Sequence, residues 1–184
     1  GLGDVYKRQG KYTDLSDAYL SVIKSLQHAA MAVDRKLVID WIEASHLEED
    51  WAAEDHEAAW AALRKADGVL VPGGFGDRGV EGKIRAAHYA RTEGVPYLGI
   101  CLGLQIATIE FCRNVLGMTG ANSTEFEDNP EHAAVVFMPE ISKTHLGGTM
   151  RLGSRPTLWQ HDGSTIRALY LSLIHISEPT RRTQ

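Results

Sequence analysis

The run Val95-Pro96-Tyr97-Leu98-Gly99-Ile100-Cys101-Leu102-Gly103-Leu104-Gln105 joins a short apolar stretch, a cysteine and the start of a helical pattern. Glycines lie two residues before and two residues after Cys101, where a sharp strand-to-helix turn crowds the backbone and leaves no room for a Cβ atom. This pattern is typical of a nucleophile elbow with a thiol in place of a hydroxyl. The first turn of a helix also favours the reactive thiolate. The alternative is a buried structural cysteine.

Apolar runs alternate with helix-like segments along the chain. This alternation predicts an α/β fold with a mainly parallel sheet that is covered on both faces. Active groups in such sheets gather at the carboxyl ends of the strands, and both Gly73-Gly74 and Cys101 follow a predicted strand. Strands are expected at 37–41, 69–71, 97–100 and 134–138. Helices are expected from a cap at Ser16 or Asp17 and at 52–65, 80–93 and 102–116.

The composition excludes several classes of protein. With 184 residues, of which 43% are hydrophobic and 23% charged, the chain is expected to form one globular domain. A net charge of −5 and the lack of a dense basic patch argue against a nucleic-acid partner. No apolar run is long enough to cross a membrane, and no histidines have the spacing of metal ligands. Two cysteines cannot form a disulfide framework, which favours a cytoplasmic protein.

A second glycine pattern, Gly74-Phe75-Gly76-Asp77-Arg78-Gly79, matches the G-x-G-x-x-G fingerprint of dinucleotide sites. Two features argue against that interpretation. Sheet elements precede the match, and the next strand ends at Cys101 without an acidic residue to hold a ribose hydroxyl. We therefore expect the N–H groups of Gly74 and Leu102 to face one oxyanion above Cys101.

Taken together, Pro72-Gly73-Gly74-Phe75-Gly76 and Gly99-Ile100-Cys101-Leu102-Gly103 resemble the class I glutamine amidotransferases. The strings Asn122-Ser123-Thr124-Glu125-Phe126 and Leu146-Gly147-Gly148-Thr149-Met150-Arg151-Leu152-Gly153 narrow the resemblance to the amidotransferase domain of CTP synthases. It implies a three-layer fold with a mainly parallel central sheet, present here as a partial domain over residues 10–171 and truncated at both ends. Residues 1–9 and 172–184 are interpreted as a leader and a tail that are foreign to the family and artefactual.

The resemblance also implies roles for the matching residues. Cys101 would attack the carboxamide of glutamine and form a glutamyl thioester, and the backbone N–H groups of Gly74 and Leu102 would bind the oxyanion. The ammonia released would pass to a synthase domain, where UTP is aminated with ATP and Mg²⁺ and GTP acts as activator. The whole enzyme would be a homotetramer. Glutamine would be held by Gly74, Leu102, Gly103, Leu104, Gln105 and Glu125.

One departure from the family bears on activity. The His-Pro-Glu segment that supplies the family's catalytic histidine and glutamate is absent, and His175-Ile176-Ser177-Glu178 has the wrong spacing to replace it. Without its general base the chain alone is expected to be inactive. Two alternatives stay open. The chain could serve another biosynthetic enzyme, such as one for GMP or carbamoyl phosphate, or it could be a reactive-cysteine α/β module without glutaminase activity.

Overall fold

The computed structural model describes residues 18–74, 76–137, 163, 165 and 167–169. The chain divides into two units, Gly1–Phe137 and Met138–Gln184. In the second unit, residues 165 and 167–169 are helical. The expected helix cap at Ser16 or Asp17 and the Leu146–Gly153 string lie outside the described residues.

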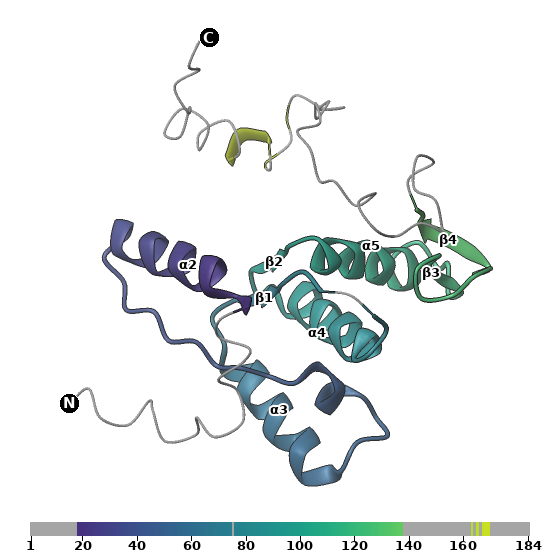
Figure 1. Cartoon of the computed structure of the whole chain (residues 1–184), viewed down its shortest axis with the longest axis horizontal. Helices are drawn as coiled ribbons and strands as arrows, with labels where there is room; N and C mark the ends of the chain where they lie inside the picture. The colour runs from purple at the N-terminus through teal and green to yellow at the C-terminus, as the bar shows by residue number, and fades with distance from the viewer. Residues whose placement is uncertain (1–17, 75, 138–162, 164, 166, 170–184) are drawn as a thin grey trace. The chain divides into compact units, whose positions relative to one another are not determined.

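The first unit follows the order expected of an α/β protein, with strands and helices in alternation (Figure 1). Its helices are α2 (Leu20–Ala32), the short 3₁₀ helix η1 (Ala44–Leu47), α3 (Ala53–Lys65), α4 (Val80–Glu93) and α5 (Leu102–Asn114), and its strands are β1 (Val69–Val71), β2 (Tyr97–Gly99), β3 (Ala121–Ser123) and β4 (His132–Val135).

Strands β1 and β2 form a parallel pair in which Val69 lies opposite Tyr97 and Val71 opposite Gly99. Helix α4 makes the crossover between them, as parallel strands require. Side chains alternate between the two faces of a sheet. Leu98 faces α2, whereas Tyr97 packs against the core formed by α4 and α5. Figure 1 accordingly shows α2 on one side of the pair and α4 and α5 on the other. The predicted parallel arrangement is confirmed. The face toward α2 is less covered than predicted, since Leu98 is 53% exposed and α2 has no buried residue.

The core between α4 and α5 is built from aliphatic side chains at helical spacing. Ile106 and Ile109 of α5 are completely buried and meet Val80 and Ile84 of α4. A second cluster joins α3, η1 and the other side of α4 through Leu47, Ala59, Leu63 and Ala86. Burial of these side chains, worth about 1.5–3 kcal/mol for each large aliphatic one, fixes α5 beneath the β1–β2 pair.

Strands β3 and β4 form a second parallel pair, which also contacts α5. The Arg113 side chain, in the last turn of α5, donates a hydrogen bond of 2.7 Å from Nε to the Ala121 carbonyl. Phe126, in the turn that follows β3, packs against the α4–α5 core. The β3–β4 pair is therefore attached to α5, the helix whose N-cap residue is Cys101.

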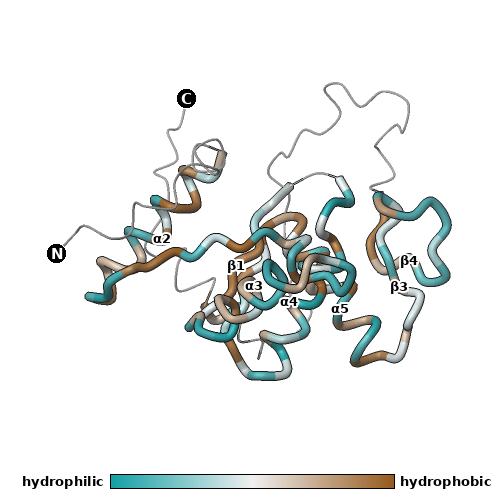
Figure 2. Tube along the Cα trace, turned by 90° about the horizontal axis from the view of Figure 1, so that it is seen from below, coloured by the Kyte–Doolittle hydropathy of each residue, from teal (hydrophilic) through white to brown (hydrophobic). Residues whose placement is uncertain are grey.

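Several boundaries match the sequence prediction, but the strand predicted at 37–41 is absent from the described structure. The bounds of β1 and α4 are as predicted, and Gly94 ends α4 in the left-handed region with a φ of 70°. The segment 37–41, predicted as a buried strand, runs without strand pairing among the described residues, and Val38 and Trp41 are 63% and 43% exposed. Figure 2 shows it as a hydrophobic stretch between α2 and β1. No described strand lies beside this segment to form a ladder, so its strand propensity alone does not make it a strand.

Two elements depart from the pattern of the sequence. The acidic composition of residues 46–57 predicts an exposed segment, yet Leu47 in η1 is buried. Strand β3 lies in a stretch, 118–129, whose composition predicts a loop. Within the described part of the chain, no helix is long and apolar enough to span a membrane.

Candidate functional site

Cys101 lies at the junction between β2 and α5. Ile100 still donates its N–H to the Val71 carbonyl at 2.9 Å, and α5 begins at Leu102. Cys101 itself has a φ of 53° and a ψ of −106°, a backbone conformation that residues with a Cβ rarely adopt. Its side chain is exposed. The chain therefore turns sharply enough at this one residue to lift the thiol out of the sheet, as a nucleophile elbow does.

The two glycines that flank Cys101 are required by close backbone approaches. A Cβ on Gly99 would lie 2.6 Å from the Leu104 nitrogen, and one on Gly103 would lie 2.9 Å from the Val71 carbonyl carbon. Cβ atoms in real structures essentially never come closer than 3.0 Å to such atoms. The predicted reason for the Gly-x-Cys-x-Gly spacing is thus seen directly in the packing of α5 on β1 and β2.

The loop that follows β1 lies beside the thiol. A Cβ built on Gly73 would be 3.2 Å from the Cys101 Cβ and 3.8 Å from its Sγ, and one on Gly74 would be 3.7 Å from the Leu102 Cδ2. The structure therefore brings Gly74, Cys101 and Leu102 together at the carboxyl ends of the two parallel strands, where sheet topology leads us to expect a site.

The first turn of α5 holds a backbone donor that the helix does not use. Gly103 donates to the Ile100 carbonyl, and Leu104 and Gln105 donate to the Cys101 carbonyl at 3.1 and 3.2 Å. The N–H of Leu102 has no protein acceptor among the described residues. Leu102 and Gly103 are buried, whereas Leu104 is 62% exposed. The side-chain Oε1 of Gln105 is buried without a hydrogen-bond partner in the described part of the chain.

Glu125, the remaining predicted glutamine-binding residue, lies in the turn after β3. Its N–H donates to the Ser123 hydroxyl at 3.2 Å. The start of β3 is held by Arg113 at the C-terminal end of α5, whereas Cys101 is at the N-terminal end of that helix. Among the described residues, no hydrogen bond or ion pair joins Glu125 to Cys101, and the structure therefore does not link these two side chains directly.

The Tyr97 side chain stabilises the junction through a hydrogen bond to the first turn of α5. Its hydroxyl donates a hydrogen bond of 2.9 Å to the Gly103 carbonyl. Burial raises the pKa of Tyr97 well above its usual value of 10.0, because the ionised form would lose its hydration. The neutral hydroxyl therefore remains a donor to the first turn of α5.

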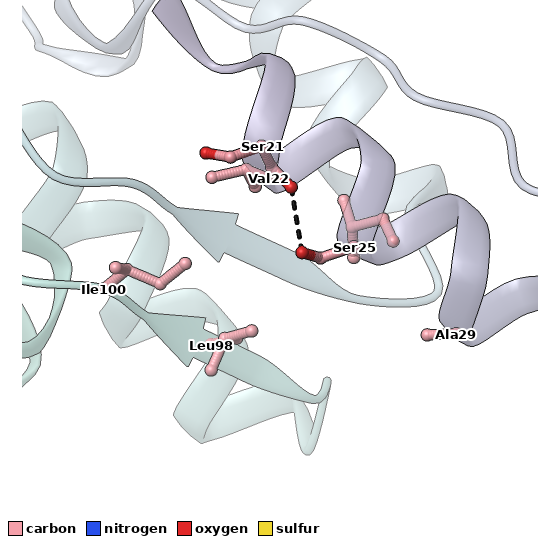
Figure 3. Close-up of a pocket in the computed structure, with 7 residues that line it drawn as sticks. Ser21, Val22, Ser25, Ala29, Leu98 and Ile100 are labelled. Carbon is pink, nitrogen blue, oxygen red and sulfur yellow. Dashed lines mark hydrogen bonds between the residues drawn. The ribbon is translucent and has the colours of Figure 1, made fainter. Parts of the chain in front are cut away.

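A residue without any signal for this role in the sequence, Tyr19, reaches the loop from the other side of the sheet. Its hydroxyl donates to the Gly73 carbonyl at 3.2 Å. Helix α2, which begins directly after Tyr19, faces β2 across a cavity lined by Val22, Ala29, Leu98 and Ile100 among others (Figure 3). A tyrosine 54 residues away from its acceptor leaves no spacing signal in the sequence.

The buried carboxylate of α5, Glu110, belongs to a structural network. Arg91 donates to both of its oxygens, at 2.8 Å from Nη2 and 2.9 Å from Nε, and the His88 Nδ1 lies 2.9 Å from Oε1. Burial tends to raise the pKa of Glu110, but hydrogen bonds from Arg91, His88 and Asn114 lower it overall. His88 is thus engaged with Glu110 and is not oriented toward Cys101.

Cys101 and Cys112 are both free thiols. Cys112, which the helical pattern places toward the core, is half-buried on α5. Among the described residues, no group of three or more His, Cys, Asp and Glu side chains is placed to hold a metal ion. At the junction, the described residues present an exposed thiol beside the backbone of Gly74 and Leu102.

Comparison with known proteins gives consistent results. A family model described as "Glutamine amidotransferase class-I" matches residues 14–175. Among curated proteins, the CTP synthase of Dictyostelium discoideum is 60% identical over 163 residues, which are 88% of this chain and 29% of that protein. Human CTP synthase 1 is 50% identical over 175 residues, which are 94% of this chain and 30% of that protein. The chain thus spans about three tenths of the length of these relatives.

Among solved structures, the glutaminase domain of Trypanosoma brucei CTPS with bound acivicin matches with a TM-score of 0.64 and 41% sequence identity. The match covers 73% of this chain and 50% of that chain. The α/β fold described above, with its parallel strands, is therefore shared with a glutaminase domain.

Proposed function

Because the chain belongs to the class I glutamine amidotransferase family, we propose that it is the glutamine-hydrolysing, ammonia-supplying part of a CTP synthase. The observation that supports this proposal most directly is the exposed Cys101 thiol, held at a positive φ beside the Gly73–Gly74 loop. An inert structural cysteine would be buried and would not need a strained backbone.

In the proposed reaction, the Cys101 thiolate attacks the carboxamide carbon of glutamine. A C–S bond forms while the carbonyl electron pair moves to oxygen. Collapse of this tetrahedral intermediate breaks the C–N bond and releases ammonia, whose leaving nitrogen takes a proton from a general acid, and a glutamyl thioester remains. Water then attacks the thioester, yielding glutamate and the free thiol.

We assign the oxyanion to the backbone N–H groups of Gly74 and Leu102. Two facts favour this assignment: Gly74 lies beside Leu102, the residue that follows Cys101, and the Leu102 N–H has no protein acceptor in the described part of the chain. Such preorganised donors stabilise charge that develops only in the transition state. Glutamine would also contact Gly103, Leu104 and Gln105, and the buried Oε1 of Gln105, unpaired among the described residues, is available for such a contact.

The Glu125 carboxylate would pair with the α-ammonium group of glutamine. Its position after β3 does not by itself favour this role. The support comes from the Asn-Ser-Thr-Glu-Phe string that contains Glu125, since this string resembles the corresponding sequence of the family.

Because the chain spans only about three tenths of the length of its curated relatives, the features of the whole enzyme are also proposed. We propose residues 10–171 as the amidotransferase domain, with the flanking stretches outside it. The synthase domain, with its UTP, ATP and Mg²⁺ sites, would belong to the remaining part of the longer protein. We also propose that the whole enzyme is activated by GTP, assembles as a homotetramer and is located in the cytoplasm.

The experiment uses the full-length protein that contains this chain. Glutamate release is measured in the unchanged protein, in Cys101→Ala and in Cys112→Ala, which is the matched control on the same helix. We expect Cys101→Ala to abolish release and Cys112→Ala to retain it. A chloroketone analogue of glutamine, whose chloride a thiolate displaces, should leave its adduct on Cys101 when the digested protein is analysed by mass spectrometry.

An adduct on Cys112, or glutamate release that survives in Cys101→Ala, would contradict the proposal. Labelling of Cys101 without any glutaminase activity in the full-length protein would favour the reactive-cysteine module instead. The 184-residue chain alone, which has no His-Pro-Glu segment, should be labelled at Cys101 but should not turn over glutamine.

A further inference from the structure

We propose that Tyr19 is a positioning residue that orients the Gly73–Gly74 peptide so that the Gly74 N–H faces the oxyanion. The inference rests on the proposed function, since it concerns how one of the two oxyanion donors is held. The observation behind it is the hydrogen bond of 3.2 Å from the Tyr19 hydroxyl to the Gly73 carbonyl.

The planarity of the peptide group links this hydrogen bond to the donor. The Gly73 carbonyl and the Gly74 N–H belong to the same peptide unit, and in a trans peptide the two groups point in opposite directions. A donor that holds the carbonyl on one side therefore fixes the N–H on the other. Tyr19 approaches from α2, whereas Gly73 lies against the Cys101 side chain and Gly74 against Leu102.

This peptide needs an external tether because glycines lie on both sides of it. A glycine adopts positive and negative φ about equally well, so that rotation of the Gly73–Gly74 peptide by half a turn meets little steric resistance. Such a flip would exchange the donor for a carbonyl oxygen, which would repel the oxyanion. The tyrosine hydroxyl has the Gly73 carbonyl as its acceptor only in the orientation that is observed.

The tether is itself well anchored. The Tyr19 carbonyl accepts the Ile23 N–H at 3.0 Å in the first turn of α2, and the Tyr19 ring lies 6.1 Å from the Trp41 ring, tilted by 31°. Helix α2 faces Leu98 and Ile100 of the strand that leads to Cys101 (Figure 3). Tyr19 therefore links the helix on one face of the sheet to the loop beside the thiol.

The test is Tyr19→Phe in the full-length protein, which removes the hydroxyl and keeps the ring. A hydrogen bond of this length lies beyond the usual O–H···O range, so we expect a fall of about fivefold in the kcat of glutamine hydrolysis. The KM should stay unchanged, because the substrate contacts are intact. Tyr89→Phe is the matched control, since the Tyr89 ring packs edge-on against Trp60 in the α3–α4 region. It should leave kcat unchanged.

A second readout separates positioning from general damage. Alkylation of Cys101 by iodoacetamide is a displacement at a saturated carbon that forms no oxyanion, so its rate should be the same in Tyr19→Phe as in the unchanged protein. A kcat that does not fall, or a parallel fall in the alkylation rate, would overturn the proposal. An unchanged kcat would show that the Gly74 N–H does not need Tyr19 to hold it in place. A slower alkylation of Cys101 would show that Tyr19→Phe disturbs the junction as a whole, which is a structural effect.

Hydrogen–deuterium exchange decides the question even if the proposed function fails. The peptide containing Gly73 and Gly74 should exchange faster in Tyr19→Phe and at an unchanged rate in Tyr89→Phe. Faster exchange in a protein without glutaminase activity would support the tether while refuting the function. Unchanged exchange in Tyr19→Phe would refute the tether whatever the activity.

Discussion

Replacing Gly103 with alanine tests the close packing that raises Cys101 out of the sheet. The new Cβ would lie 2.9 Å from the Val71 carbonyl carbon, and still nearer to its oxygen, whereas ordinary contacts begin at 3.4 Å. Because the nearest atoms are the Val71 carbonyl and Cβ, which no rotamer change can move, α5 must move off β1 by at least the difference of 0.5 Å. Overpacking of this kind costs about 3 kcal/mol at the upper end of its usual range. Alanine recovers about 1 kcal/mol of helix propensity, which leaves a net loss of about 2 kcal/mol.

The assay is equilibrium urea unfolding followed by tryptophan fluorescence, with Gly68→Ala as the matched control. With a denaturant slope of about 2 kcal/mol per molar urea, the loss corresponds to a midpoint lower by about 1 M. A Cβ on Gly68 would lie 3.6 Å from the Pro96 carbonyl oxygen, an ordinary contact, so that variant should unfold within about 0.5 kcal/mol of the unchanged protein. Equal midpoints for the Gly103 and Gly68 variants would refute the argument that glycine is needed for the approach of α5 to β1.

Three further predictions concern α5 and its support. Arg91→Met should lower the urea midpoint of unfolding at pH 7, because the buried Glu110 carboxylate loses its charged hydrogen-bond partner. The pKa of Glu110 is lower in the folded state than its usual value of 4.5, so the stability that the ion pair contributes is complete above pH 4.5 and is lost as the pH falls. The urea midpoints of Arg91→Met and the unchanged protein should therefore converge below pH 4.5. A constant difference between them at every pH would contradict this. Tyr97→Phe should cost about 1 kcal/mol at pH 7 for the lost hydrogen bond. Because burial raises the pKa of Tyr97, its stabilisation is complete below pH 10.0 and lost above it, so thermal melts of the unchanged protein should fall more steeply in alkali than those of the variant. Iodoacetamide should modify Cys101 about tenfold faster than the half-buried Cys112 in the native protein, as measured by mass spectrometry; equal rates would argue against an exposed thiol at the junction.

The elements next to the site could be predicted from the sequence because local signals agreed with the packing. Val69–Val71 is β-branched and apolar, and it is followed by Pro72 and glycines that stop a strand. Helix α4 ends where Gly94 adopts a positive φ. The Gly-x-Cys-x-Gly spacing predicted the junction at Cys101, since the same steric demand acts wherever a helix starts so close to a strand.

Elements without a local signal were missed or misplaced. Ala121-Asn122-Ser123 has no strand propensity, and β3 exists because it pairs with β4 and is held by Arg113. The 37–41 run has strand propensity but no described pairing partner. Tyr19 reaches Gly73 only through the folded arrangement, so its role could not be predicted from spacing. The location of Glu125 relative to the thiol likewise depends on tertiary structure.

The backbone angles of Cys101 lower the stability of the fold in exchange for the position of the thiol. A residue with a side chain at a φ of 53° costs the fold about 1–3 kcal/mol, a penalty that glycine does not incur. Cys101→Gly should therefore melt at a higher temperature than the natural sequence while having no sulfur at the junction. A laboratory selection for heat tolerance alone would discard this cysteine among its first changes, whereas a selection that also required ammonia release would have to find its gains elsewhere in the chain.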